Sequence, residues 1–174
     1  DVIAGLSGQQ VAGKTILVYA LCTQSVLGAY RPDRRFGTPK LRRRTKDLES
    51  FILALEKVGI SPDRVIVAGH STGGWAGLLA ARREIVSPAG VIAFAPSFAG
   101  ESETRAEGWK WLRQRELAYL IDGGRIDGMV FGFAGDPFEE PEALSVLQKI
   151  DRLVFKTVAP SPACDVETAH LAFD

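Results

Sequence analysis

Apolar runs and amphipathic segments alternate along this chain. Short apolar runs have the length and composition of buried strands, and we expect strands at residues 14–20, 64–68, 90–96, 128–134 and 153–158. The longer segments between them have the character of helices, which we expect at residues 41–58, 74–83, 103–121 and 141–150. Strands that alternate with helices are typical of an α/β protein with a mostly parallel sheet and helices on both faces.

The remaining segments are short or irregular. Residues 1–12 have helical spacing interrupted by glycine and predict a short helix. Residues 21–39 show no sustained period and predict a long loop, of a kind that often belongs to a binding site. The chain has 174 residues and no internal repeat, so we expect residues 1–174 to form a single domain.

Basic residues crowd the start of the helix expected at residues 41–58, where positive charge opposes the helix dipole. They are Arg31, Arg34, Arg35, Lys40, Arg42, Arg43, Arg44 and Lys46. One interpretation is a solvated face whose charges pair with acids elsewhere. The other is a site for an anionic substrate or a lipid headgroup.

The composition excludes several classes of function. The chain has 21 Lys and Arg against 21 Asp and Glu, so no bulk charge favours nucleic acid or a membrane surface. No apolar run approaches the roughly 20 residues of a membrane-spanning helix. With two histidines and two cysteines in the whole chain, we expect neither a zinc enzyme nor a metal cofactor. No signal peptide is visible, so we expect a cytoplasmic protein, or a periplasmic or secreted one whose signal has been removed.

The motif Gly-x-Ser-x-Gly at residues 69–73 lies between an expected strand and an expected helix. A strand that reverses into a helix within one residue strains the turning residue, usually to positive φ, and small neighbours must make room for it. Gly69, Gly73 and Gly74 provide that room. The turn would expose the Ser71 hydroxyl and place the Thr72 N–H at the helix N-terminus, where it can stabilise an oxyanion.

A serine nucleophile needs a base, and the base needs a group that orients it. His70 is adjacent to Ser71, but neighbouring side chains on a sharp turn point apart, which leaves His170 as the base. Asp136 directly follows an expected strand and precedes a proline, and we interpret it as the orienting acid. Other candidates for the acid are Asp165, Glu167 and Glu139.

The order Ser71, Asp136, His170 and the strand-turn-helix context resemble the α/β-hydrolase superfamily over nearly the whole chain. The segments Gly-His-Ser-Thr-Gly-Gly-Trp, Phe-Ala-Gly-Asp-Pro-Phe and Ala-His-Leu-Ala-Phe are most similar to dienelactone-hydrolase-like serine hydrolases. The resemblance implies cleavage of a small ester-like substrate without metal or organic cofactor, with these three residues as catalytic residues. Two alternatives stay open: a non-catalytic binding protein on the same scaffold, and an acyltransferase. No pattern specifies an oligomeric state.

The chain departs from that superfamily in two places. In the superfamily, the second oxyanion donor comes from a loop after an earlier strand, often at a His-Gly pair. This chain has no such pair before residue 20. If residues 16–20 are the oxyanion strand, the N–H groups of Leu21 and Cys22 would take this role. We favour an alignment in which the chain begins inside the fold. Because it stops four residues after His170, we expect it to be short at both ends.

Two cysteines bear on the compartment. Cys22 and Cys164 follow the first and the last expected strands. Strands several places apart in a sheet are separated by more than the roughly 7 Å that a disulfide allows between Cα atoms. We therefore expect no Cys22–Cys164 disulfide.

Overall fold

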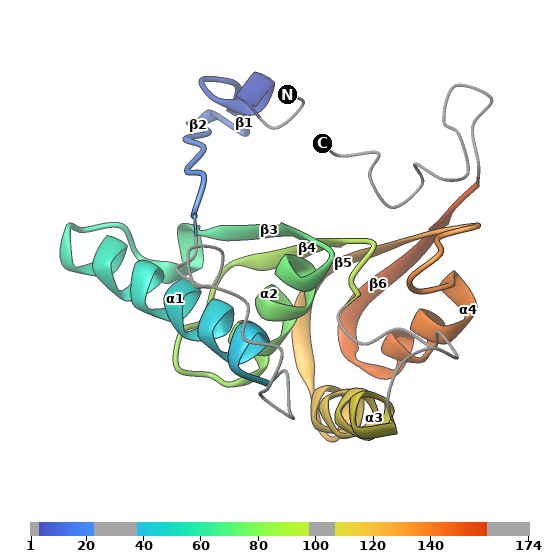
Figure 1. The fold of residues 1–174 in the computed structure, drawn as a ribbon. Coiled ribbons are helices and arrows are strands. Elements are labelled where there is room, and N and C mark those ends of the chain that lie inside the picture. The colour runs from blue at the N-terminus through green and yellow to red at the C-terminus, as the bar shows by residue number, and fades with distance from the viewer. Residues whose placement is uncertain (1–3, 23–37, 98–106, 160–174) are drawn as a thin grey trace.

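A computed structural model describes residues 4–22, 38–97 and 107–159 of the chain. Its centre is a four-stranded sheet in the order β3-β4-β5-β6, in which every neighbouring pair is parallel (Figure 1). The strands are β3 (Ile66–His70), β4 (Gly90–Phe94), β5 (Arg125–Phe133) and β6 (Asp151–Val158). The expected α/β class and parallel sheet are confirmed, with strand positions within a few residues of those expected.

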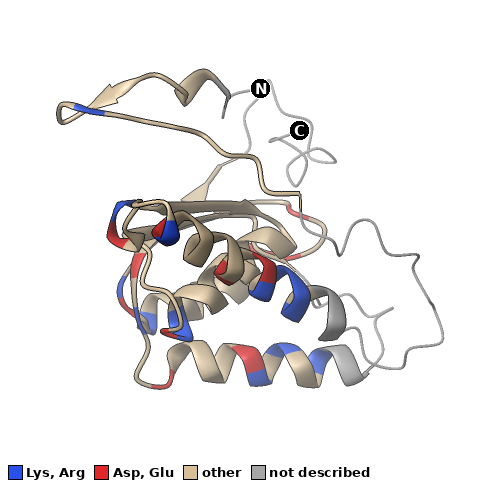
Figure 2. Cartoon of the chain, turned by 90° about the vertical axis from the view of Figure 1, so that its left-hand side faces the viewer, with Lys and Arg blue, Asp and Glu red and all other residues tan. Residues whose placement is uncertain are grey.

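The helices follow the same alternation. They are α1 (Thr38–Lys57), α2 (Thr72–Arg82), α3 (Glu107–Ile121) and α4 (Pro141–Leu144), the last continued by the 3-10 helix η4 (Ser145–Lys149). In Figure 1 all four lie on the same side of the sheet, and Figure 2 shows acidic and basic residues distributed over this helical layer. In the described part of the chain, the helical layer thus covers one face only.

One hydrophobic core joins this helical layer to the sheet. Val67 of β3 lies beside Val91 of β4, and both side chains are buried beneath α2. A Cβ on Gly77 of α2 would lie 3.1 Å from Val67 and 3.2 Å from Val91, so the helix packs closely on the strands. Trp75 and Leu78 of α2 are fully buried. The helix that follows the Gly-x-Ser-x-Gly motif is therefore fixed rigidly against the sheet.

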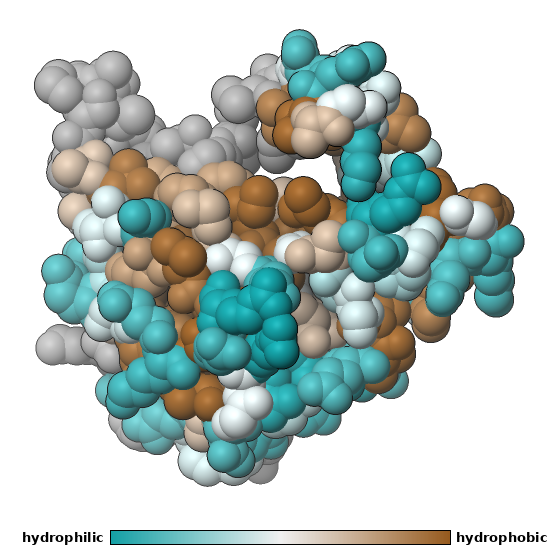
Figure 3. Space-filling view, turned by 180° about the vertical axis from the view of Figure 1, so that it is seen from behind, coloured by the Kyte–Doolittle hydropathy of each residue, from teal (hydrophilic) through white to brown (hydrophobic). Residues whose placement is uncertain are grey.

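The opposite face of the sheet carries apolar side chains that are more exposed. Ile66 is 64% exposed and Val154 is 45% exposed. Between them, the rings of Phe94 and Phe131 stack at 5.3 Å. Figure 3 shows apolar residues gathered in the upper part of the molecule, at the level of the sheet.

The N-terminal prediction is wrong. In place of a helix over residues 1–12 and a buried strand over 14–20, the structure has a short 3-10 helix, Ala4–Leu6, and a small antiparallel hairpin of β1 (Gln10–Val11) and β2 (Lys14–Thr15). Ala12 and Gly13 both have positive φ, 51° and 73°, as a tight two-residue hairpin turn requires. The turn pairs the chain with itself, and Leu17 within the expected strand is 65% exposed.

A buried carboxyl between α1 and the end of α2 makes stability depend on pH. Arg83 Nε lies 3.3 Å from Glu49 Oε1, and Glu49 is buried. Burial raises the pKa of the Glu49 carboxyl above its ordinary value of 4.5, against the opposing effects of Arg83 and Lys46. The folded protein therefore holds this proton at higher pH than the unfolded chain does. The contribution of Glu49 to stability must therefore fall as the pH rises above the pKa that this carboxyl has in the unfolded chain.

We expect the pH dependence of stability that Glu49 causes to disappear in Glu49→Gln, because the glutamine side chain does not titrate in this pH range. Urea denaturation of both proteins between about pH 4 and pH 7 measures it. The free energy of unfolding of the wild type, minus that of the variant, should decrease as the pH rises. A difference that increases with pH would contradict this assignment.

Candidate active site

Ser71 stands at the sharp turn between β3 and α2. Its φ is 52° and its ψ is −124°, so the positive φ expected for this residue is confirmed. A Cβ on Gly69 would lie 2.5 Å from the Gly73 carbonyl carbon and oxygen, so only glycine fits there. A Cβ on Gly73 itself would meet nothing within 4 Å. The expectation that Gly73 also makes room for the turn is therefore wrong, because its α-carbon faces open space.

The turn leaves backbone donors at the start of α2. The Trp75 N–H donates to the Ser71 carbonyl at 3.3 Å, which closes the first turn of the helix. The N–H groups of Thr72 and Gly73 precede that bond and have no acceptor within the helix. Positive partial charge gathers at such a helix N-terminus. This is the environment in which the Thr72 N–H can stabilise a developing negative charge.

Strand β4 and the residues after it hold the turn in place. The Ser71 N–H donates to the Phe94 carbonyl at 3.0 Å. The hydroxyls of Ser71 and Thr72 both donate to the Ser97 carbonyl, at 3.5 and 3.2 Å. Ser97 is buried, and no motif in the sequence marks it. Its position after β4, next to the strand that leads into the motif, was the available signal.

Asp136 lies in the loop after β5 and is 1% exposed. Its own N–H donates to the Phe133 carbonyl at 3.1 Å. Its Oδ1 accepts the N–H groups of Phe138 at 2.8 Å and Glu139 at 3.3 Å. A carboxylate bonded to the backbone two and three residues ahead has a fixed orientation.

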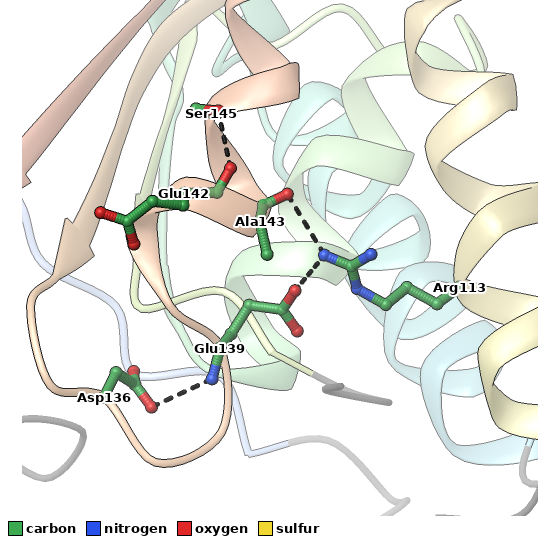
Figure 4. A network of polar contacts seen from close by, with 6 residues as sticks. All are labelled: Arg113, Asp136, Glu139, Glu142, Ala143 and Ser145. Carbon is green, nitrogen blue, oxygen red and sulfur yellow. Dashed lines mark hydrogen bonds and ion pairs between the residues drawn. The ribbon is translucent and has the colours of Figure 1, made fainter. Parts of the chain in front are cut away.

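Glu139 and Arg113 form a buried ion pair beside this loop (Figure 4). The Arg113 Nη2 atom contacts Glu139 Oε1 and also donates to the Ala143 carbonyl at 3.3 Å. Arg113 is not among the residues predicted from the sequence. It precedes the buried Leu117 by four residues and Leu120 by seven, so helical spacing placed it on the buried face of α3.

The register of the sheet brings the loops of Ser71 and Asp136 to the same edge. His70, Phe94 and Phe131 are neighbours across β3, β4 and β5, so both loops leave from the carboxyl ends of the strands. One strand separates them, which corresponds to about 10 Å at 4.8 Å per strand. Ligands of parallel sheets bind at this edge. Val158, the last residue of β6, pairs with Phe133 at the same edge.

Several expected residues lie outside the described part of the chain. They are His170, the other candidate acids Asp165 and Glu167, and Cys164. Cys22 is described, and its thiol is exposed and free. Its proposed oxyanion role required residues 16–20 to be a strand of the main sheet, and they are not. That role therefore loses its structural basis.

Within the described ranges, no three His, Cys, Asp or Glu side chains are grouped as a metal ion would require. The same ranges contain no helix with the length and apolarity needed to cross a membrane.

Residues 15–170 match the sequence profile of the alpha/beta hydrolase family. No curated protein is significantly similar to the chain. A variant of SOBER1 from Arabidopsis thaliana has a similar structure, with a TM-score of 0.51 and 12% identity, over 78% of this chain and 63% of that one. An S-formylglutathione hydrolase from Agrobacterium tumefaciens is also similar, with a TM-score of 0.48 and 16% identity, over 71% of this chain and 50% of that one. A carboxylesterase from Bacillus cereus has a TM-score of 0.46 and 13% identity, over 95% of this chain and 69% of that one. The chain thus spans less than two thirds of the first two structures.

Proposed function

Since this chain belongs to the alpha/beta hydrolase family, we propose that it is a serine hydrolase that cleaves an ester or related acyl bond through an acyl-enzyme on Ser71. The observation that carries the proposal is the conformation of Ser71, with φ of 52° at the N-terminus of α2. Backbone strain of this kind costs about 1–3 kcal/mol and persists where the surrounding structure requires it. The resemblance of its motifs to those of dienelactone-hydrolase-like enzymes supports a small ester-like substrate.

In the proposed reaction the Ser71 hydroxyl attacks the acyl carbon while His170 takes its proton. The negative charge that develops on the carbonyl oxygen is stabilised by the Thr72 N–H and the positive end of α2. His170 then gives the proton to the leaving alcohol, and the bond between the acyl carbon and that alcohol breaks. A water molecule, activated by the same imidazole, releases the acid and restores the serine.

We propose Asp136 as the residue that orients His170. Its carboxylate is buried and held by two backbone N–H groups, so it can present a fixed acceptor to an imidazole N–H. Glu139, the other candidate acid among the described residues, is engaged by Arg113 instead. This pairing supports the choice of Asp136.

A fluorophosphonate probe tests the proposal, because it labels only an activated serine. We expect the wild type to be labelled at Ser71 and Ser71→Ala to remain unlabelled. Ser50, exposed on α1, provides the matched control: Ser50→Ala should be labelled like the wild type. A wild type that resists the probe while folded would contradict the proposal and favour a binding protein on the hydrolase scaffold.

A further inference from the structure

We propose that Arg113 and Glu139 are positioning residues that fix the Asp136 carboxylate from the side of α3, an inference that rests on the proposed function. Figure 4 shows the connection: Arg113 reaches from α3 to Glu139, and the Glu139 N–H reaches Asp136. One guanidinium thereby connects a helix of the core to the loop that carries the candidate acid.

The connection is short and uses different parts of Glu139. Its side chain is fully buried against Arg113, while its backbone N–H donates to Asp136 Oδ1 at 3.3 Å. The side chain that Arg113 holds and the N–H that Asp136 accepts belong to the same residue, so anchoring the Glu139 side chain restrains the position of this donor. Because the reacting groups must be aligned closely, a shift of about 1 Å can cost a hundredfold in rate.

Arg113 also holds α4, the helix that follows this loop. Its Nη2 atom donates to the Ala143 carbonyl of α4 at 3.3 Å, while contacting Glu139. Residues 139 and 143 are thus attached to the same group. α3 is itself anchored by Leu117 and Leu120, which are buried in the core. Arg113 therefore attaches the loop to a helix that is itself fixed in the core.

Stability alone is a poor reason for such a pair. Apolar residues of similar volume often replace a buried ion pair without loss of stability, because removing two charges from water is costly. What the planar guanidinium adds is direction, since its donors point at fixed angles. A pair that fixes direction more than it adds stability is what a positioning role needs.

The test compares the same substitution at adjacent residues. Glu139→Gln loses the ion pair, whereas Glu140→Gln removes one charge from the same loop, and its amide oxygen can still accept the Gly135 N–H that Glu140 Oε2 accepts at 3.3 Å. Hydrolysis of a p-nitrophenyl ester is the readout. We expect Glu139→Gln to lower kcat about ten- to a hundredfold with KM within about twofold, and Glu140→Gln to leave both within about twofold.

A double-mutant cycle separates positioning from a general loss of structure. If Glu139 acts through Asp136, Glu139→Gln should cause no further loss of kcat in an Asp136→Asn background. If Glu139→Gln does not fold, the pair Arg113→Met and Glu139→Leu, which leaves no buried charge, carries the same cycle. Additive losses, or equal losses in Glu139→Gln and Glu140→Gln, would overturn the inference alone. A wild type that neither hydrolyses the ester nor reacts with the fluorophosphonate would overturn the proposed function and this inference with it.

Discussion

Asp136→Asn is expected to lower kcat/KM by about three to four orders of magnitude while leaving the fold intact. The asparagine side chain has the same shape, and its carbonyl oxygen can accept the N–H groups of Phe138 and Glu139 that Oδ1 accepts now. What it loses is the negative charge that favours the reactive tautomer of His170 and stabilises the imidazolium. Steady-state hydrolysis of a p-nitrophenyl ester measures the loss, and circular dichroism and thermal melting establish that the fold is retained.

Asp127→Asn is the matched control, since Asp127 lies on the same strand, β5, as the loop of Asp136. Its half-exposed carboxylate pairs with Arg152 at the surface. An exposed pair of this kind is worth about 0.2–1 kcal/mol, so we expect activity close to that of the wild type. Near-normal activity in Asp136→Asn would transfer the orienting role to Asp165 or Glu167.

Local sequence patterns predicted most of the sheet and its helices because local pattern and burial agree there. Each central strand is a short apolar run, and each sits against a helix whose apolar face is buried. The motif at residues 69–73 carries a requirement that sequence can express, since only glycine fits at Gly69. Its place between a strand and a helix therefore predicted the positive φ of Ser71.

The predictions that failed depend on where a segment lies in space. Residues 14–20 have the composition of a buried strand, yet the turn at Ala12 and Gly13 pairs Lys14 and Thr15 with the chain just before them. An apolar run cannot reveal which partner its backbone will find. Arg113 was missed for a related reason: a charged residue on a helix is usually solvated, and only the distant Glu139 gives it a buried partner.

The two glycines of the motif should respond oppositely to the same substitution. In Gly69→Ala the new methyl group would lie 2.5 Å from the Gly73 carbonyl group and 2.8 Å from the Gly74 nitrogen, all of them backbone atoms. Backbone cannot swing aside as a flexible side chain can, so the start of α2 must move away from β3. Overpacking of this kind costs about 1–3 kcal/mol or more. We expect a clearly lower urea midpoint, and labelling of Ser71 slowed by about a hundredfold.

Gly73→Ala is the control, with the same added atom two residues beyond Ser71. Nothing lies within 4 Å of its Cβ, and the residue is helical, so alanine should leave the free energy of unfolding unchanged or raise it by up to about 1 kcal/mol. Urea denaturation of the two variants and the wild type gives the comparison directly. Equal midpoints for Gly69→Ala and Gly73→Ala would contradict the close approach of β3 and α2, and with it the reason why Ser71 adopts its strained conformation.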